Sequence, residues 1–173
     1  MKLSTFCGGV LLATVSQANA AVEVTFRDGN PWDVFLITST DCPISEAELR
    51  IDLTTSVAGV LIDTEYGGAG TQDPLPAELA SGDAILRPVS DGDQLLTVQI
   101  TRLDVDTPIR LQMDVDDTAG TQYAPRVQVA LHEMTGATVT LSYAGSTTSA
   151  PFDPNGLARV PLAENAPSCA LIG

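Results

Sequence analysis

The most constraining feature of this 173-residue chain is the two-residue period of its apolar side chains. From Val22 onward, apolar and polar residues mainly alternate, which places each set on its own face of an extended strand. The clearest case is the segment 47–53, whose apolar members are Ala47, Leu49, Ile51 and Leu53. A helix of 3.6 residues per turn would scatter these side chains around its circumference. The pattern therefore predicts half-buried strands and an all-β protein.

Turn-forming residues divide the alternating sequence into ten short segments. The strands that we expect are 22–27, 33–38, 47–53, 60–62, 84–88, 94–103, 109–115, 126–131, 137–142 and 157–162. Gly, Pro, Asn and Asp gather between these segments and favour turns there, whereas residues 65–83 show no clear pattern. About nine or ten short strands at this spacing predict an immunoglobulin-like or jelly-roll β-sandwich.

Residues 1–20 have the composition of an export signal. Met1 and Lys2 give a short basic start, and the apolar stretch that follows is too short to span a bilayer. The triplet Ala18-Asn19-Ala20 offers the small side chains that signal peptidase requires, so we expect cleavage after Ala20. The remaining residues 21–173 are long enough to bury a core as a single β-sandwich domain. The expected location is secreted, either periplasmic or extracellular.

The chain is strongly acidic, with 22 Asp and Glu against 8 Lys and Arg and a net charge of −14. Proteins bind nucleic acids and anionic lipids through clusters of Lys and Arg, so this balance argues against both as partners. No second hydrophobic segment indicates membrane insertion. The charge suits a salty medium, where screening removes self-repulsion, and it equally suits ordinary acidic solubilisation.

Two cysteines remain once Cys7 has left with the signal. Cys42 and Cys169 are an even pair in an oxidising compartment, and we predict a disulfide between them. This bond would tie the C-terminal tail to the early strands, and in the chain-entropy model it would contribute about 4–5 kcal/mol of stability.

Four aspartates form a candidate calcium site. If the strand that follows Asp93 is paired with an antiparallel return strand, Asp116 and Asp117 come back to the end where Asp91 and Asp93 begin. Calcium takes six to eight oxygen ligands, and clustered carboxylates at strand ends supply them. The alternative is that these four residues are turn-forming aspartates on an acidic surface, bonded to their own backbone.

The same strand directions place other residues. Asp104 and Asp106 fall at the opposite end of the sandwich, because they follow the outgoing strand. In the returning strand Met113 and Val115 point into the core, so Asp114 and Asp116 point outward and only the end of the strand leans over the rim.

Residues for nucleophilic catalysis are scarce. His132 is the only histidine, and no Gly-x-Ser-x-Gly elbow surrounds any serine. We therefore expect no catalytic residues, and we expect His132 to be either exposed or a structural histidine with its hydrogen bonds satisfied. A small secreted hydrolase that uses paired carboxylates stays as an alternative, because distance in space rather than in sequence sets that mechanism.

The chain resembles the small exported bacterial proteins called aggregation factor core. The resemblance rests on Cys42 ahead of an alternating strand and on four runs, namely VTFRDG at 24–29, DVFLI at 33–37, DGD at 91–93 and MDVDDT at 113–118. It spans essentially all of residues 21–173. By analogy with sponge adhesion proteins, the family name implies calcium-linked cell adhesion, and it carries over no catalytic residues.

These observations predict a non-enzymatic exported interaction module, stabilised by calcium, whose partner is a protein or glycan at the cell surface or in the matrix. The first alternative is the hydrolase described above. The second is an envelope subunit that binds its partner by strand addition at an exposed sheet edge. The sequence leaves the oligomeric state open.

Overall fold

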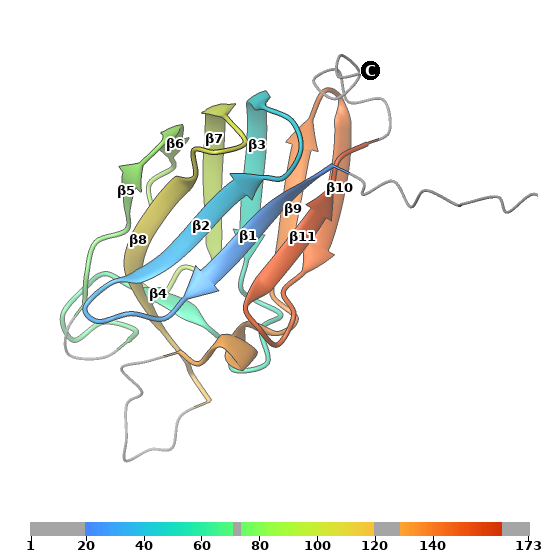
Figure 1. Ribbon diagram of the computed structural model, residues 1–173. Coiled ribbons are helices and arrows are strands. Elements are labelled where there is room, and N and C mark those ends of the chain that lie inside the picture. Colours follow the sequence, from blue (N-terminus) through green and yellow to red (C-terminus); the bar gives the residue numbers. More distant parts are fainter. Residues whose placement is uncertain (1–19, 71–73, 120–128, 164–173) are drawn as a thin grey trace, which may run out of the picture.

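The computed structural model describes residues 20–70, 74–119 and 129–163, which form two antiparallel sheets packed face to face (Figure 1). The six-stranded sheet has the order β11–β1–β2–β8–β4, and β5 also pairs with β8. Its strands are β1 (Ala21–Arg27), β2 (Asp33–Ser39), β4 (Leu61–Asp63), β5 (Glu78–Ser81), β8 (Ile109–Asp116) and β11 (Leu157–Pro161).

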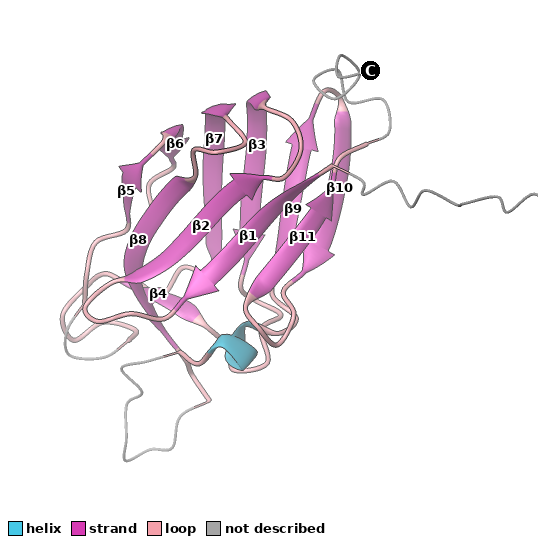
Figure 2. Cartoon of the chain, viewed as in Figure 1, coloured by secondary structure: helices cyan, strands magenta, loops and turns pink. Residues whose placement is uncertain are grey.

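The second sheet has five strands in the order β10–β9–β3–β7–β6. They are β3 (Ile44–Asp52), β6 (Asp83–Leu86), β7 (Leu95–Leu103), β9 (Thr138–Tyr143) and β10 (Ser146–Pro151). In the described part of the chain, the only helical element is the short 3-10 helix η1 (Leu131–Met134), which Figure 2 shows below the sheets.

The inward faces of the two sheets share one hydrophobic core. In β3, for example, Leu49 and Ile51 are fully buried while Arg50 between them is exposed. The ring of Phe35 lies 5.2 Å from that of Phe26 and 6.3 Å from that of Phe152, measured between centroids. Burial of each large apolar side chain contributes about 1.5–3 kcal/mol, so this core is the main source of stability.

Both open sides of the sandwich are closed. On one side the chain passes from β5, paired with β8, to β6, paired with β7, through Gly82 at φ 105°. A Cβ at Gly82 would lie 2.8 Å from Ile109 Cα, so only glycine fits at this corner. On the other side, Thr148 Oγ1 of β10 donates a hydrogen bond of 2.8 Å to Pro161 O of β11.

The predicted all-β sandwich is confirmed, and its described residues form eleven strands instead of nine or ten. The expectation lacked β5 and β10, because their sequences, ELAS and STTSAP, have little apolar alternation. The strand expected over 126–131 is wrong where it can be checked. Residues 129 and 130 are not in a strand and Leu131 begins η1, where the Glu133 carboxylate accepts the backbone N–H of Ala130 at 2.7 Å. The expected signal falls almost entirely on residues 1–19, outside the described residues.

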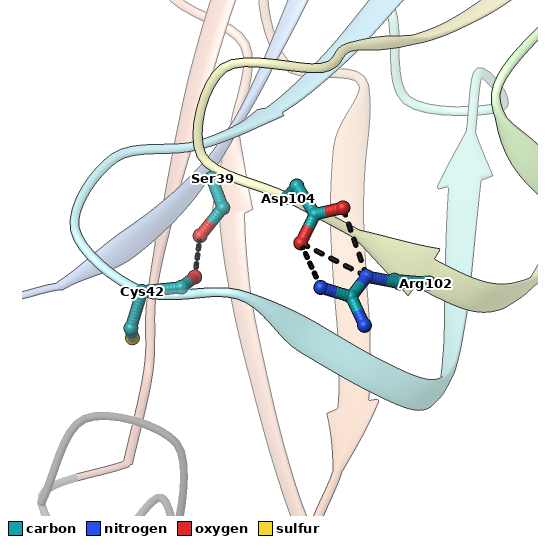
Figure 3. Close-up of polar contacts among 4 residues, drawn as sticks. All are labelled: Ser39, Cys42, Arg102 and Asp104. Atoms are coloured by element: carbon teal, nitrogen blue, oxygen red, sulfur yellow. Dashed lines mark hydrogen bonds and ion pairs between the residues drawn. The ribbon is translucent and has the colours of Figure 1, made fainter. Parts of the chain in front are cut away.

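The two ends of the sandwich differ in charge arrangement. We call the end that carries β4, η1 and the start of β7 the β4 end (Figure 1). At the opposite end, Ser39 Oγ donates to the backbone oxygen of Cys42 (Figure 3). Close by, the Arg102 guanidinium binds the Asp104 carboxylate at 2.7–2.9 Å. Asp104 therefore lies at the end predicted for it and is paired there with a cation.

Candidate metal centre

The β4–β8 ladder gathers three aspartates at the β4 end. Asp63 of β4 lies opposite Asp114 of β8, and Leu61 lies opposite Asp116. Opposite residues of an antiparallel ladder project from the same face, as do residues two apart on one strand. The three aspartates therefore share the face of the ladder that points away from the core residue Val115. Carboxylate oxygens of Asp63, Asp114 and Asp116 lie within 4.8 Å of one another.

These three side chains are buried although they point away from the core. Asp63 has no exposed area, Asp114 is 6% exposed and Asp116 is 2% exposed. Residues 64–70, which we call the 64–70 loop, approach them closely. A Cβ at Gly70 would lie 2.3 Å from Asp116 Oδ2 and 2.5 Å from Asp63 Cγ. The absence of a side chain at Gly70 is therefore what lets the backbone lie against the carboxylates.

Asp91 holds the 64–70 loop in this position. Its Oδ1 accepts hydrogen bonds from the backbone N–H groups of Thr64 at 3.0 Å and Glu65 at 3.2 Å, and its Oδ2 accepts one from Ala69 at 2.6 Å. Gly68 also lies against this carboxylate, since a Cβ there would stand 2.3 Å from Asp91 Oδ2. The N–H groups of Thr64 and Ala69 stabilise the ionised form and lower the pKa of Asp91.

The pKa of Asp63 is shifted in the opposite direction to that of Asp91. Burial, followed by the adjoining carboxyls of Asp91 and Asp116, raises the pKa of Asp63 to about 6. Its Oδ2 is buried and accepts no hydrogen bond from the described residues. A buried carboxylate oxygen that has neither a donor nor a cation beside it costs free energy. A positive charge bound beside Asp63 would therefore stabilise the cluster.

The donor set fits a hard cation. All three ligand residues of the cluster offer carboxylate oxygens, which suit calcium, magnesium or manganese rather than the thiolate and imidazole sites of zinc or copper. Oxygens on opposite sides of one calcium ion, each bound at about 2.4 Å, lie about 4.8 Å apart. The carboxylate oxygens of the cluster lie within 4.8 Å of one another, so they can reach a single ion. Three carboxylates supply up to six oxygens if each is bidentate. Magnesium demands near-ideal octahedral geometry at about 2.1 Å and usually keeps several waters, whereas calcium accepts a flexible set of carboxylates, so calcium is the ion that we expect here.

The four residues predicted to bind calcium have different surroundings. Asp116 belongs to the cluster, and Asp91 lies beside Asp63 and fixes the loop. The Asp93 carboxylate instead accepts the N–H of Ser90 at 2.7 Å, which is the turn-forming alternative for that residue. Both carboxylate oxygens of Asp117 are buried and accept no hydrogen bond from the described residues. Asp117 nevertheless stands outside the three-residue cluster.

Sequence reasoning missed Asp63 and placed Asp114 on an open surface. Asp63 directly follows the strand expected over 60–62, but nothing in the sequence shows that this strand pairs with the end of β8. The predicted directions of the strands before and after Asp104 place Asp91 and Asp116 at the correct end, but the predicted pairing of these two strands is wrong. β7 and β8 are not neighbours, because β8 returns in the opposite sheet. Asp91 and Asp116 still reach the same end.

The structure also places Cys42 and His132. Cys42 is 1% exposed and disulfide-bonded, while its predicted partner Cys169 lies outside the described residues, so that pairing stays a prediction. His132 is exposed on η1.

The fold and the site together define a β-sandwich that buries an aspartate cluster between a strand end and a glycine-rich loop. No protein-family model matches the chain, and no curated protein matches it significantly. The resemblance to aggregation factor core proteins accordingly stays a prediction. Within the described residues, no helix has both the length and the apolar character of a membrane span.

Proposed function

We propose that this protein is an exported, non-enzymatic β-sandwich module that binds calcium at Asp63, Asp114 and Asp116 and acts in interactions at a cell surface or in the matrix. The observation that carries the proposal is the buried Asp63 carboxylate, which belongs to the group of three carboxylates and whose Oδ2 accepts no hydrogen bond from the described residues. A divalent cation would supply the missing positive charge.

The position of the cluster gives the cation a structural role. β4 belongs to the six-stranded sheet, whereas Asp93 leads into β7 of the five-stranded sheet. Backbone hydrogen bonds already join them, because Ile62 N donates to Asp93 O at 3.0 Å and Gly92 N donates to Ile62 O at 2.9 Å. A cation bound beside this junction would stabilise the end where the two sheets meet. The cluster is 0–6% exposed, so a ligand bridged by the cation is not part of the proposal.

Calcium titration and thermal melts of the exported protein test the binding step. At a calcium concentration one hundred times the Kd, binding would add about 2.7 kcal/mol, which corresponds to a rise in Tm of about 5–10 °C. Asp63→Asn should abolish most of this rise. The matched control is Asp106→Asn, which removes the same charge at an exposed position of the opposite end and should keep the full rise. Binding that persists in Asp63→Asn, or its absence from the wild-type protein, would contradict the site.

The interaction step needs a separate test. Beads that carry many copies of the protein convert weak single contacts into measurable avidity. We expect such beads to attach to cells or matrix of the source organism in calcium and to detach in a chelator. If wild-type and Asp63→Asn beads attach equally well, adhesion does not depend on the cation site.

One observation favours the hydrolase alternative. Asp63 and Asp91 are adjacent carboxyls whose pKa values are shifted in opposite directions, which is the pattern of an acid–base pair. The burial of Asp63 opposes it, because a substrate cannot reach a side chain with no exposed area. Glycosidase assays on soluble polysaccharides, with Asp63→Asn as the control, decide between the two functions.

Strand addition is less favoured by the sheet edges. β6, at one edge of the five-stranded sheet, has only four residues, and β10 at the other edge ends at Pro151. Short edge strands and proline are features that discourage pairing with another chain.

A further inference from the structure

The 64–70 loop has little packing of its own. Residues 65–69 are exposed, and Tyr66, the largest of them, is 80% exposed. The contacts that hold the loop are instead with carboxylates: three N–H groups donate to Asp91, and Gly70 lies against Asp63 and Asp116. The loop therefore packs against an acidic surface rather than against the apolar core.

Without a cation, the carboxylates beneath the closed loop repel one another and make this arrangement electrostatically unfavourable. Asp63, Asp91, Asp114 and Asp116 gather beneath a few residues of backbone, and the buried Oδ2 of Asp63 receives no hydrogen bond from the described residues. Repulsion among carboxylates at this spacing is stronger in a buried site than in water. A loop that covers them excludes the water that would otherwise screen their charge.

From this arrangement we infer that closure of the 64–70 loop and occupancy of the cation site are coupled. The inference rests on the proposed calcium function and concerns its regulation. The ion enters when the loop is open, because the cluster is buried from solvent when the loop is closed over it. Once bound, the ion neutralises the carboxylates and holds the loop in place. Calcium would thereby set the position of Tyr66 on the surface.

Coupling of this kind is reciprocal. If calcium favours the closed loop, a change that prevents closure must weaken calcium binding by the same factor. Gly70→Ala is such a change, because its methyl group would stand 2.3 Å from Asp116 Oδ2. Gly67→Ala is the matched control. A Cβ at Gly67 meets nothing within 4 Å, although its φ of 72° makes alanine strained there as well.

Hydrogen exchange of the exported wild-type protein, measured in calcium and in chelator, tests the inference. We expect calcium to slow exchange of the Thr64, Glu65 and Ala69 amides at least about tenfold, which corresponds to about 1.4 kcal/mol. Amides in the centre of β3 serve as the internal reference. We also expect Gly70→Ala to weaken calcium binding about tenfold or more, with Gly67→Ala close to wild type.

The outcomes separate the coupling from the function on which it rests. Calcium that binds and raises Tm, yet leaves the three loop amides unprotected, would overturn the coupling and leave the proposed function standing. A protein that binds no calcium would overturn both. If Gly70→Ala does not fold, as judged by circular dichroism in chelator, the exchange experiment on the wild-type protein decides alone.

Discussion

Asp33 shows how one buried side chain makes the stability of this fold depend on pH. It is 2% exposed at the start of β2, and it accepts hydrogen bonds from the backbone N–H groups of Gly29 at 3.1 Å and Val115 at 3.0 Å. Burial dominates these bonds and, with the nearby carboxylates of Asp28 and Asp114, raises the pKa of Asp33 to about 7.

The calcium-free protein should therefore lose stability as the pH rises from about 4 to 7. A group whose pKa is raised by folding stabilises the fold while it is protonated, and this stabilisation disappears as the pH passes the folded-state pKa. For Asp33 the loss amounts to at most about 4 kcal/mol. Chemical denaturation across this pH range, in chelator, should show a smaller decline for Asp33→Asn than for wild type. Equal slopes for the two proteins would show that Asp33 does not control the effect.

At the scale of elements, the sequence predicts a strand correctly where one face of the strand is buried. It does not predict the strands that have no buried face. β3 alternates clearly because its inner residues meet the opposite sheet. β5 and β10 lie at the margins of the sandwich, and their patterns mix small and polar residues. Their positions follow from hydrogen bonding to β8 and β9 and from the corners that join the sheets, neither of which appears in the local sequence.

The corner at Gly82 should tolerate alanine less well than the turn at Gly145. Gly82→Ala would place a methyl group 2.8 Å from Ile109 Cα in a backbone conformation at φ 105° that alanine disfavours. We expect it to lower the free energy of unfolding by about 2–4 kcal/mol. Gly145→Ala is the control, since φ is also positive there but a Cβ would meet no atom within 4 Å. Its expected cost is about 1 kcal/mol. Urea denaturation of both variants provides the comparison, and similar losses would contradict the steric argument.

For the molecule as a whole, the net charge of −14 sets the response to salt. Screening lengths fall from about 30 Å at 0.01 M to about 3 Å at 1 M ionic strength, so salt should relieve self-repulsion of the folded state. In chelator, Tm should rise with sodium chloride and rise equally with tetramethylammonium chloride, because screening does not depend on which monovalent cation is used. A rise with sodium alone would indicate site binding instead.

The order of residues in the chain determined the class of fold and part of the acidic cluster at the β4 end. Period-two alternation is a local property, because each side chain's face depends only on its position along the strand, and the all-β sandwich followed from it. It also placed Asp91 and Asp116 at one end, since that required only strand directions.

Only the tertiary structure decided which carboxylates meet. Asp63 reaches Asp114 through the β4–β8 register, and the 64–70 loop buries a face that alternation alone assigns to solvent. Strand register and loop placement depend on contacts between residues far apart in the chain, and the periodicity of a single segment holds no information about them.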